Sequence, residues 1–193
     1  MIRRLYDWTM RLASHKQAPR ALFLVSFIES SFFPIPPDVM LVPMVLAQRV
    51  KAWVFASIAT VGSVLGGVAG YLIGLFLFDL IGKPLLDLYG YSEQFTHFAN
   101  QYNEYGALIV FFFGVTPFPY KVITIASGVT QLNFLIFILA SIAARGLRFF
   151  LVSGLLYWFG EPIRDFIEQR LGLVTTLFLV LLIGGFVGLR YLV

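Results

Sequence analysis

Long apolar runs alternate with short polar segments along the chain, and prolines interrupt two of the runs. Pro34, Pro36 and Pro37 break the first run, residues 21–47. A single helix does not continue through prolines placed so closely. The halves on either side would be helices of about 18 and 15 Å, whereas a hydrocarbon core is about 30 Å thick. The pattern predicts either a broken span or a re-entrant hairpin that enters and leaves on one side.

A second apolar run, residues 105–130, is broken in the same way by Pro117 and Pro119. Residues 52–81 and 134–160 are continuous apolar runs, each long enough to cross a bilayer as a tilted helix. The chain is therefore expected to combine two proline-broken hairpins with full spans.

The polar segments predict the remaining elements. Residues 82–104 are polar and aromatic, which favours an interfacial connector, and residues 161–172 form a charged loop. In residues 1–20, bases alternate with apolar residues, which indicates an amphipathic helix on the cytoplasmic leaflet. Residues 173–193 predict a C-terminal transmembrane helix.

The two proline breaks mark an internal repeat. Pro34 corresponds to Pro117 and Asp38 to Lys121, and both pairs are 83 residues apart (117 minus 34, 121 minus 38). If each hairpin is re-entrant, each unit crosses the bilayer once, so the second unit is inverted relative to the first. The sequence thus predicts an all-α integral membrane protein. Its domain, residues 21–172, would hold repeat 1 (about 21–81), the connector (82–104) and repeat 2 (about 105–163).

The composition indicates that the apolar runs are embedded in a membrane. Hydrophobic residues make up 59% of the chain and charged residues 12%, about half the charged share of soluble domains. There are no cysteines, and His15 and His97 lie outside the apolar runs, so neither a metal site nor a cofactor is expected.

The bases flank the apolar segments, which is typical of topology control and anionic-lipid contact rather than of nucleic-acid binding. With re-entrant hairpins, Lys83 and Arg190 would be the outer bases outside the spans. Nine would be cytoplasmic: Arg3, Arg4, Arg11, Lys16, Arg20, Arg49, Lys51, Arg164 and Arg170. If both hairpins crossed fully, the division would be eight against three. The positive-inside rule therefore favours re-entrant hairpins and a cytoplasmic N-terminus.

Five ionisable residues lie inside apolar runs: Glu29, Asp38, Lys121, Arg145 and Arg148. Each would cost about 3 kcal/mol or more at the bilayer centre, which makes them candidate functional residues. Asp38 and Lys121 occupy equivalent hairpin tips and would face each other if the tips meet. Arg145 and Arg148 lie one turn apart on one helix face.

Together the five charges sum to +1, and broken half-helices add dipoles, so the site suits an anionic group such as a phosphate. A buried carboxyl at Glu29 or Asp38 could also carry a proton. The alternative is that these residues form structural ion pairs that hold the hairpins together.

A row of glycines follows one face of the span at residues 52–81. The row has four-residue spacing: Gly62, Gly66, Gly70 and Gly74. Small residues at this spacing let helices approach closely in lipid. The row could be a sliding surface for lipid, a plain packing contact or a dimer seam.

At these residues the sequence resembles the DedA family, whose domain is also called the SNARE-associated Golgi protein or VTT domain. The likeness lies in Glu29-Ser-Ser-Phe-Phe-Pro34-Ile-Pro36-Pro37-Asp38, in the glycines of residues 62–74, and in residues 113–128. The family commonly has an arginine after the glycine of the second hairpin and another after the proline. Here Val115 follows Gly114 and Lys121 is the only base in that loop, which suggests a divergent, YqaA-like branch.

The resemblance implies a multi-pass protein of the bacterial inner membrane with two opposed re-entrant hairpins. It also implies movement of lipids, such as undecaprenyl phosphate or phospholipids, that depends on the proton motive force. We therefore expect a lipid transporter, flippase or scramblase for anionic head groups, with protons and membrane lipids as partners and homo-oligomers possible. The alternatives are an ion-coupled transporter of a small anion and a non-catalytic assembly factor. A lipid-cleaving enzyme is not expected, because no His, Cys or Ser/His pair lies in the apolar core.

Overall fold

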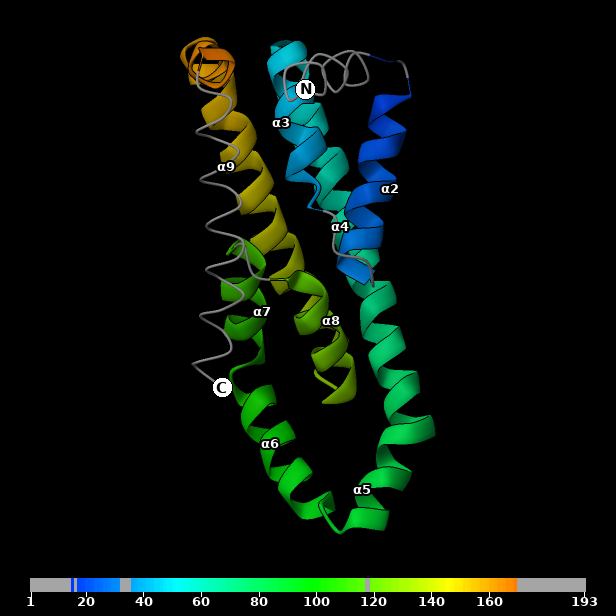
Figure 1. Ribbon diagram of the computed structural model, residues 1–193. Coiled ribbons are helices and arrows are strands. Elements are labelled where there is room, and N and C mark those ends of the chain that lie inside the picture. The colour runs from blue at the N-terminus through cyan, green and yellow to red at the C-terminus, as the bar shows by residue number, and fades with distance from the viewer. Residues whose placement is uncertain (1–14, 16, 32–35, 117–118, 170–193) are drawn as a thin grey trace.

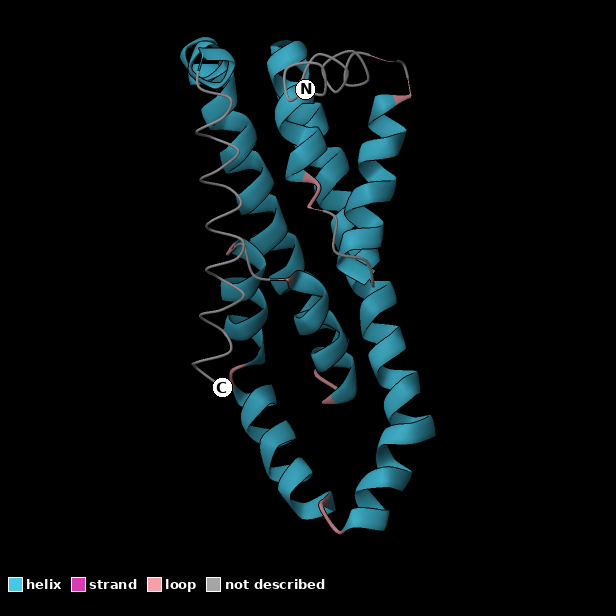
Figure 2. Cartoon of the chain, viewed as in Figure 1, coloured by secondary structure: helices cyan, strands magenta, loops and turns pink. Residues whose placement is uncertain are grey.

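The computed structural model describes residues 15, 17–31, 36–116 and 119–169, and within these ranges it contains helices and no strands (Figures 1 and 2). The predicted helical class is confirmed. The elements, in chain order, are α2 (Ala18–Ser31), α3 (Asp38–Ala47), η1 (Arg49–Lys51), α4 (Ala52–Leu77), the π-helix η2 (Phe78–Gly82), α5 (Lys83–Tyr89), α6 (Ser92–Glu104), α7 (Gly106–Val115), α8 (Tyr120–Val129) and α9 (Phe134–Gln169).

Two short hairpins approach each other from opposite ends of the molecule (Figure 1). Helix α2 runs from the upper end to mid-height and α3 returns upward, whereas α7 rises to mid-height and α8 returns downward. Pro37 precedes α3 and Pro119 precedes α8, so proline stands where each returning helix starts. Pro34 and Pro117 lie outside the described residues.

The long helices α4 and α9 run in opposite directions through the molecule and pack on each other. Helix α4 also packs on α2 and α8, and α9 packs on α7 and α3. Each long helix therefore contacts the first helix of its own hairpin and the second helix of the other. By length and composition, Arg49–Tyr89 and Phe134–Gly160 are the helical segments of the described chain that could cross a membrane.

The glycine row of α4 is an internal packing surface. A Cβ at Gly66 would lie 2.1 Å from the Phe27 carbonyl oxygen of α2, and one at Gly74 would lie 2.1 Å from the Ile125 oxygen of α8. Gly62 and Gly70 are similarly close to neighbouring helices, and all four are buried. Because both hairpins of the same chain cover this face, it is not a dimer seam.

Two hydrophobic clusters stand one above the other. The upper cluster joins α2, α3 and the start of α4 to Phe149 of α9, and the lower joins α7, α8 and Tyr71 of α4 to Phe137 of α9. The stretch of α9 that carries Arg145 and Arg148 lies between Phe137 and Phe149, where the hairpin tips meet.

Helix α9 extends further than the sequence predicted. The charged loop at residues 161–172 was a wrong prediction for residues 161–169, which are helical. Phe159 leaves the helical conformation (φ −112°, ψ 15°), so Pro162 falls in the first turn of a new helical segment, where proline is tolerated. Arg49 donates to the Tyr157 carbonyl beside this kink, at 3.2 Å from its Nε. Of the amphipathic helix predicted at residues 1–20, residues 18–20 form the start of α2, and residues 1–14 and 16 lie outside the described residues, as does the helix predicted at 173–193.

Candidate functional site

The guanidinium of Arg145 ties four helices together. Its Nη2 lies 3.1 Å from Oε2 of Glu29 on α2, and its Nε donates to the Ser63 hydroxyl of α4 at 2.6 Å. Its Nη1 donates to the Gly114 carbonyl of α7 at 3.4 Å. The side chain is 2% exposed, and Glu29 is 12% exposed.

Two aromatic rings lie against the same guanidinium. The centroids of Tyr120 and Phe149 each lie 4.8 Å from the Arg145 Cζ, which is within cation–π range. Tyr120 belongs to the lower hydrophobic cluster and Phe149 to the upper one. Arg145 therefore joins the two clusters, and its position is fixed by its hydrogen bonds and by the two rings.

Hydroxyl groups complete the surroundings of Glu29. The Ser30 hydroxyl donates to Glu29 Oε2 at 3.0 Å and lies 2.7 Å from the Ser63 hydroxyl. Thr124 of α8 donates to the Ser30 carbonyl at 3.1 Å, so α8 contacts α2 at the same level. Sequence analysis missed Ser30, Ser63 and Thr124. The available signal was hydroxyl residues inside apolar runs, which commonly hydrogen-bond across helices in membranes.

One turn further along α9, Arg148 joins the two hairpin tips. Its Nη2 lies 2.6 Å from Oδ2 of Asp38, the first residue of α3, and its Nη1 donates to the carbonyl of Thr116, which follows α7, at 2.6 Å. The Arg148 side chain is 17% exposed and Asp38 is 26% exposed. Among the described residues, Oδ1 of Asp38 is buried and has no hydrogen-bond partner.

Four of the five predicted charges thus meet as two ion pairs at mid-height. The sequence predicted that Asp38 would face Lys121, whereas the structure pairs Asp38 with Arg148. Lys121 is half-buried in the first turn of α8, next to Tyr120, whose hydroxyl donates to Ser141. The two pairs balance in charge, so Lys121 provides the net positive charge of the set.

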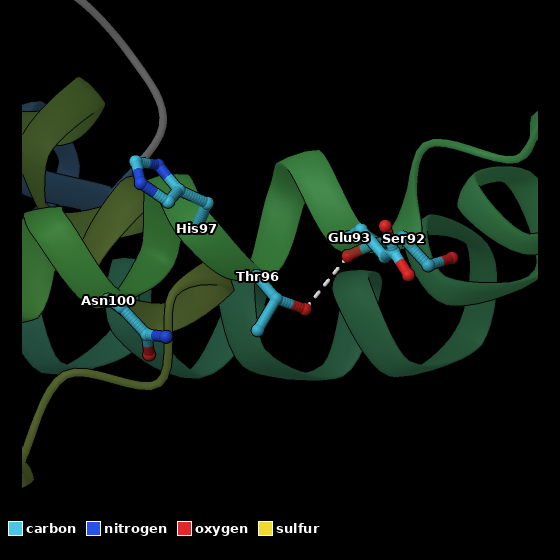
Figure 3. A pocket seen from close by; sticks show the side chains of 5 residues that line it. All are labelled: Ser92, Glu93, Thr96, His97 and Asn100. Carbon is cyan, nitrogen blue, oxygen red and sulfur yellow. Dashed lines mark hydrogen bonds between the residues drawn. The ribbon is translucent and has the colours of Figure 1, made fainter.

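Two hollows in the surface lie away from these charges. One, of about 420 Å³, is lined by five side chains of α6, and Figure 3 shows Thr96 donating to the Ser92 carbonyl inside it. The other, of about 450 Å³, lies between α2 and α4. Neither is lined by any of the five charged residues. We therefore base the site on the geometry of the ion pairs, not on these hollows.

Within the described residues, this geometry is that of an all-helical protein in which ion pairs hold two short hairpins against one long helix, with apolar helices long enough to cross a membrane. The chain belongs to the VTT domain family, whose family profile matches residues 33–158. This confirms the resemblance to the DedA family.

Two relatives are similar over most of their length. An uncharacterized protein of Haemophilus influenzae is 40% identical over 157 residues, which cover 81% of this chain and 81% of that protein. An uncharacterized protein of Histophilus somni, described as a homolog of HI0703, is 38% identical over 167 residues, or 86% of this chain and 87% of that protein. No solved structure matches the chain.

Proposed function

We propose that this protein moves anionic lipids with a phosphate-type head group, the class of undecaprenyl phosphate and phospholipids, across the bacterial inner membrane. The observation that carries this proposal is the Asp38–Arg148 pair at the meeting point of the hairpin tips. It is partly exposed, and one oxygen of its carboxylate has no partner among the described residues. Replacing the carboxylate of such a partly exposed, incompletely hydrogen-bonded pair by another anion costs less free energy than it would in a buried pair with all its hydrogen bonds made.

The opposed hairpins support an inverted repeat with re-entrant segments. Helices α3 and α8, at Asp38–Ala47 and Tyr120–Val129, are too short to cross about 30 Å of hydrocarbon. Helix α4 packs on the first helix of its own hairpin and the second helix of the other, and α9 does the same. This is the contact pattern expected if a two-fold axis relates the two repeats. In such transporters the substrate site lies between the repeats near the midplane.

Arg148 is the group best placed to receive a phosphate oxygen. A guanidinium presents two parallel N–H donors to a phosphate, and here one of these positions is taken by Asp38. When Asp38 accepts a proton from a hydronium ion on the proton-rich side of the membrane, the carboxyl loses its charge and releases Nη2 to the incoming anion. Lys121, in the first turn of α8, adds a positive charge at the tip of the second hairpin. Release of the proton to water on the other side restores the ion pair and expels the anion.

The distribution of bases supports an orientation with the upper end in the cytoplasm. Arg20, Arg49 and Lys51 lie at that end, and Lys83 lies at the lower end together with Asp79 and Asp87. The positive-inside rule places basic ends on the cytoplasmic side. In this arrangement the protein would bind and move lipid without covalent chemistry.

The test is lipid translocation by the purified protein in liposomes under an imposed pH gradient, with fluorescent phosphatidylglycerol and undecaprenyl phosphate as substrates. The wild type should move both lipids faster when the gradient is present, and Asp38→Asn should abolish that stimulation. Asp79→Asn is the matched control. It makes the same chemical change in an exposed pair with Lys83, away from the hairpin tips.

Three outcomes would contradict the proposal or its site. Uptake of a soluble phosphate or other small anion without lipid movement would instead establish a small-anion transporter. No movement of either class by verified, folded protein would point to an assembly role. Equal loss in Asp38→Asn and Asp79→Asn would show that the hairpin tips are not the site.

A further inference from the structure

The hollow between α2 and α4 is a groove in the upper half of the molecule (Figure 1). Four residues of α2 and Ile58 of α4 line it: Pro19, Arg20, Phe23 and Leu24. The two helices touch one turn lower along α4, because a Cβ at Gly62 would lie 2.7 Å from the Phe23 carbonyl oxygen. Ile58, one turn before Gly62, has a bulky side chain, which keeps the helices further apart at its level and leaves the groove between them.

The groove is apolar inside and basic at its edge. Because its lining is almost wholly apolar, Arg20 contributes its aliphatic stem, and the exposed guanidinium stands outside the lining. None of the ion pairs among the described residues involves Arg20. No acid of the two flanking helices lies nearby either, since Glu29 is the one acid of α2 and α4 has none. The positive charge at this edge is therefore available to an anion.

The height of Arg20 matches the boundary between hydrocarbon and head groups. Glu29, nine residues further along α2 (29 minus 20), pairs with Arg145 at mid-height, where the hairpin tips meet. Nine residues of helix span about 14 Å, close to half of a hydrocarbon core of about 30 Å. With the hairpin tips at the midplane, Arg20 lies at the depth of the lipid phosphates. Phe23 and Leu24, one turn deeper, lie in the acyl layer.

We propose that this groove binds one phospholipid with an anionic head group as a stably bound component of the protein. The phosphate pairs with the Arg20 guanidinium, and the first part of one acyl chain fills the space between α2 and α4. The chain matches the apolar lining, and the head group matches the charge at the edge. This lipid is distinct from the transported one, because the charges at the hairpin tips do not line the groove. The proposal does not depend on the proposed transport function.

Native mass spectrometry of the delipidated protein tests this site, with phosphatidylglycerol and phosphatidylcholine of the same acyl chains as probes. The wild type should bind one phosphatidylglycerol about five-fold more tightly than phosphatidylcholine, the preference that one base near a membrane surface gives. Arg20→Gln should lower the affinity for phosphatidylglycerol to that for phosphatidylcholine, and Arg20→Lys should keep most of the preference. Lys51→Gln is the matched control, because it removes an exposed base at the same end of the molecule but outside the groove.

A second pair of variants tests the acyl chain. Ile58→Trp places a large ring in the groove and should weaken the tightest binding of both lipids several-fold. Leu147→Trp adds the same ring at an exposed position of α9, away from the groove, and should leave both affinities unchanged. Glycerol 1-phosphate, which has the charge and no acyl chain, should not displace phosphatidylglycerol at equal concentration.

Four outcomes would overturn the proposal. Equal affinities for the two lipids in the wild type would show that the groove does not select charge, and equal losses in Arg20→Gln and Lys51→Gln would indicate general surface attraction. Displacement by glycerol 1-phosphate would show an anion site without a lipid chain. A preference that survives Arg20→Gln and Ile58→Trp but disappears in Arg148→Gln would place the lipid at the hairpin tips. That last result would support the transport site, so the two proposals can fail separately.

Discussion

The two ion pairs of α9 have the same chemistry and different surroundings. In the Glu29–Arg145 pair the side chains are 12% and 2% exposed, and Arg145 has hydrogen-bond partners at all three nitrogens and two aromatic rings within cation–π range. The Asp38–Arg148 pair, one turn away, is partly exposed and leaves a carboxylate oxygen unpaired within the described chain. A pair with all its hydrogen bonds made loses much free energy when one partner leaves, whereas a pair with an unpaired oxygen loses less. The difference suggests that the first pair holds the fold and the second binds and releases the substrate.

The largest effect is expected from Arg145→Met. The variant leaves Glu29 buried without its cation, which typically costs about 3–5 kcal/mol in the free energy of unfolding. Unfolding by SDS titration in mixed micelles measures this loss. The double variant Glu29→Gln with Arg145→Met should recover part of it, because no unpaired charge then remains. Wild-type stability in the single variant would contradict a structural role for this pair.

A smaller loss is expected from Gly66→Ala. The new methyl group would lie 2.1 Å from the Phe27 carbonyl oxygen, so α2, which carries Glu29, must move away from α4. Such overpacking costs about 1–3 kcal/mol. Gly146→Ala is the matched control, since its nearest neighbour would be the Thr60 methyl group at 3.9 Å. The same SDS titration should separate the two variants, and equal stability would show that the α2–α4 contact is not tight.

Asp38→Asn should separate stability from function. Because this pair is partly exposed, its loss should change the free energy of unfolding by about 1 kcal/mol or less. The gradient-stimulated lipid movement should nevertheless disappear, because the amide cannot take up and release a proton. Unfolding and translocation measured on the same preparation test both statements. A large loss of stability would place Asp38 with the structural pair instead.

The smallest effect is expected from Lys121→Gln. Lys121 is half-buried at the tip of the second hairpin, so its neutralisation should change stability by less than about 1 kcal/mol. It should raise the concentration of anionic lipid that gives half-maximal transport several-fold, while the maximal rate stays near wild type. Transport rates at increasing mole fractions of anionic lipid measure this shift. A lost maximal rate with unchanged half-saturation would assign Lys121 to the transport step itself.

Much of this architecture was predictable from local sequence, and the partners of the charges were not. Prolines end helices by local steric rules, so the breaks near Pro37 and Pro119 and the long runs between them could be predicted from the chain. Which charges pair depends on how α9 is rotated against both hairpins, and this is set by packing over the whole molecule. The offset of 83 residues aligned Asp38 with Lys121, but the side chain that reaches Asp38 comes from α9.

The kink at Phe159 is a second feature that could not be predicted from local sequence. The charges of residues 161–172 predicted a loop, but a break at Phe159 places Pro162 in the first turn of a new helical segment. The detailed structure of the connector was likewise not predictable. A polar connector was expected from residue 82 onward, whereas the structure forms α5 and α6 there, and the π-helix η2 joins α4 to α5.

The ion pair between Glu29 and Arg145 has a consequence for how the chain is synthesised and inserted. Glu29 leaves the ribosome 116 residues before its cation. At about 5–20 residues per second, roughly 6–23 seconds of synthesis separate the two. During that interval the first hairpin is in or beside the bilayer with an unpaired carboxyl, so the insertion machinery or water must shelter it. The first half of the chain is therefore an incomplete folding unit, and commitment to the native arrangement waits for the arrival of α9.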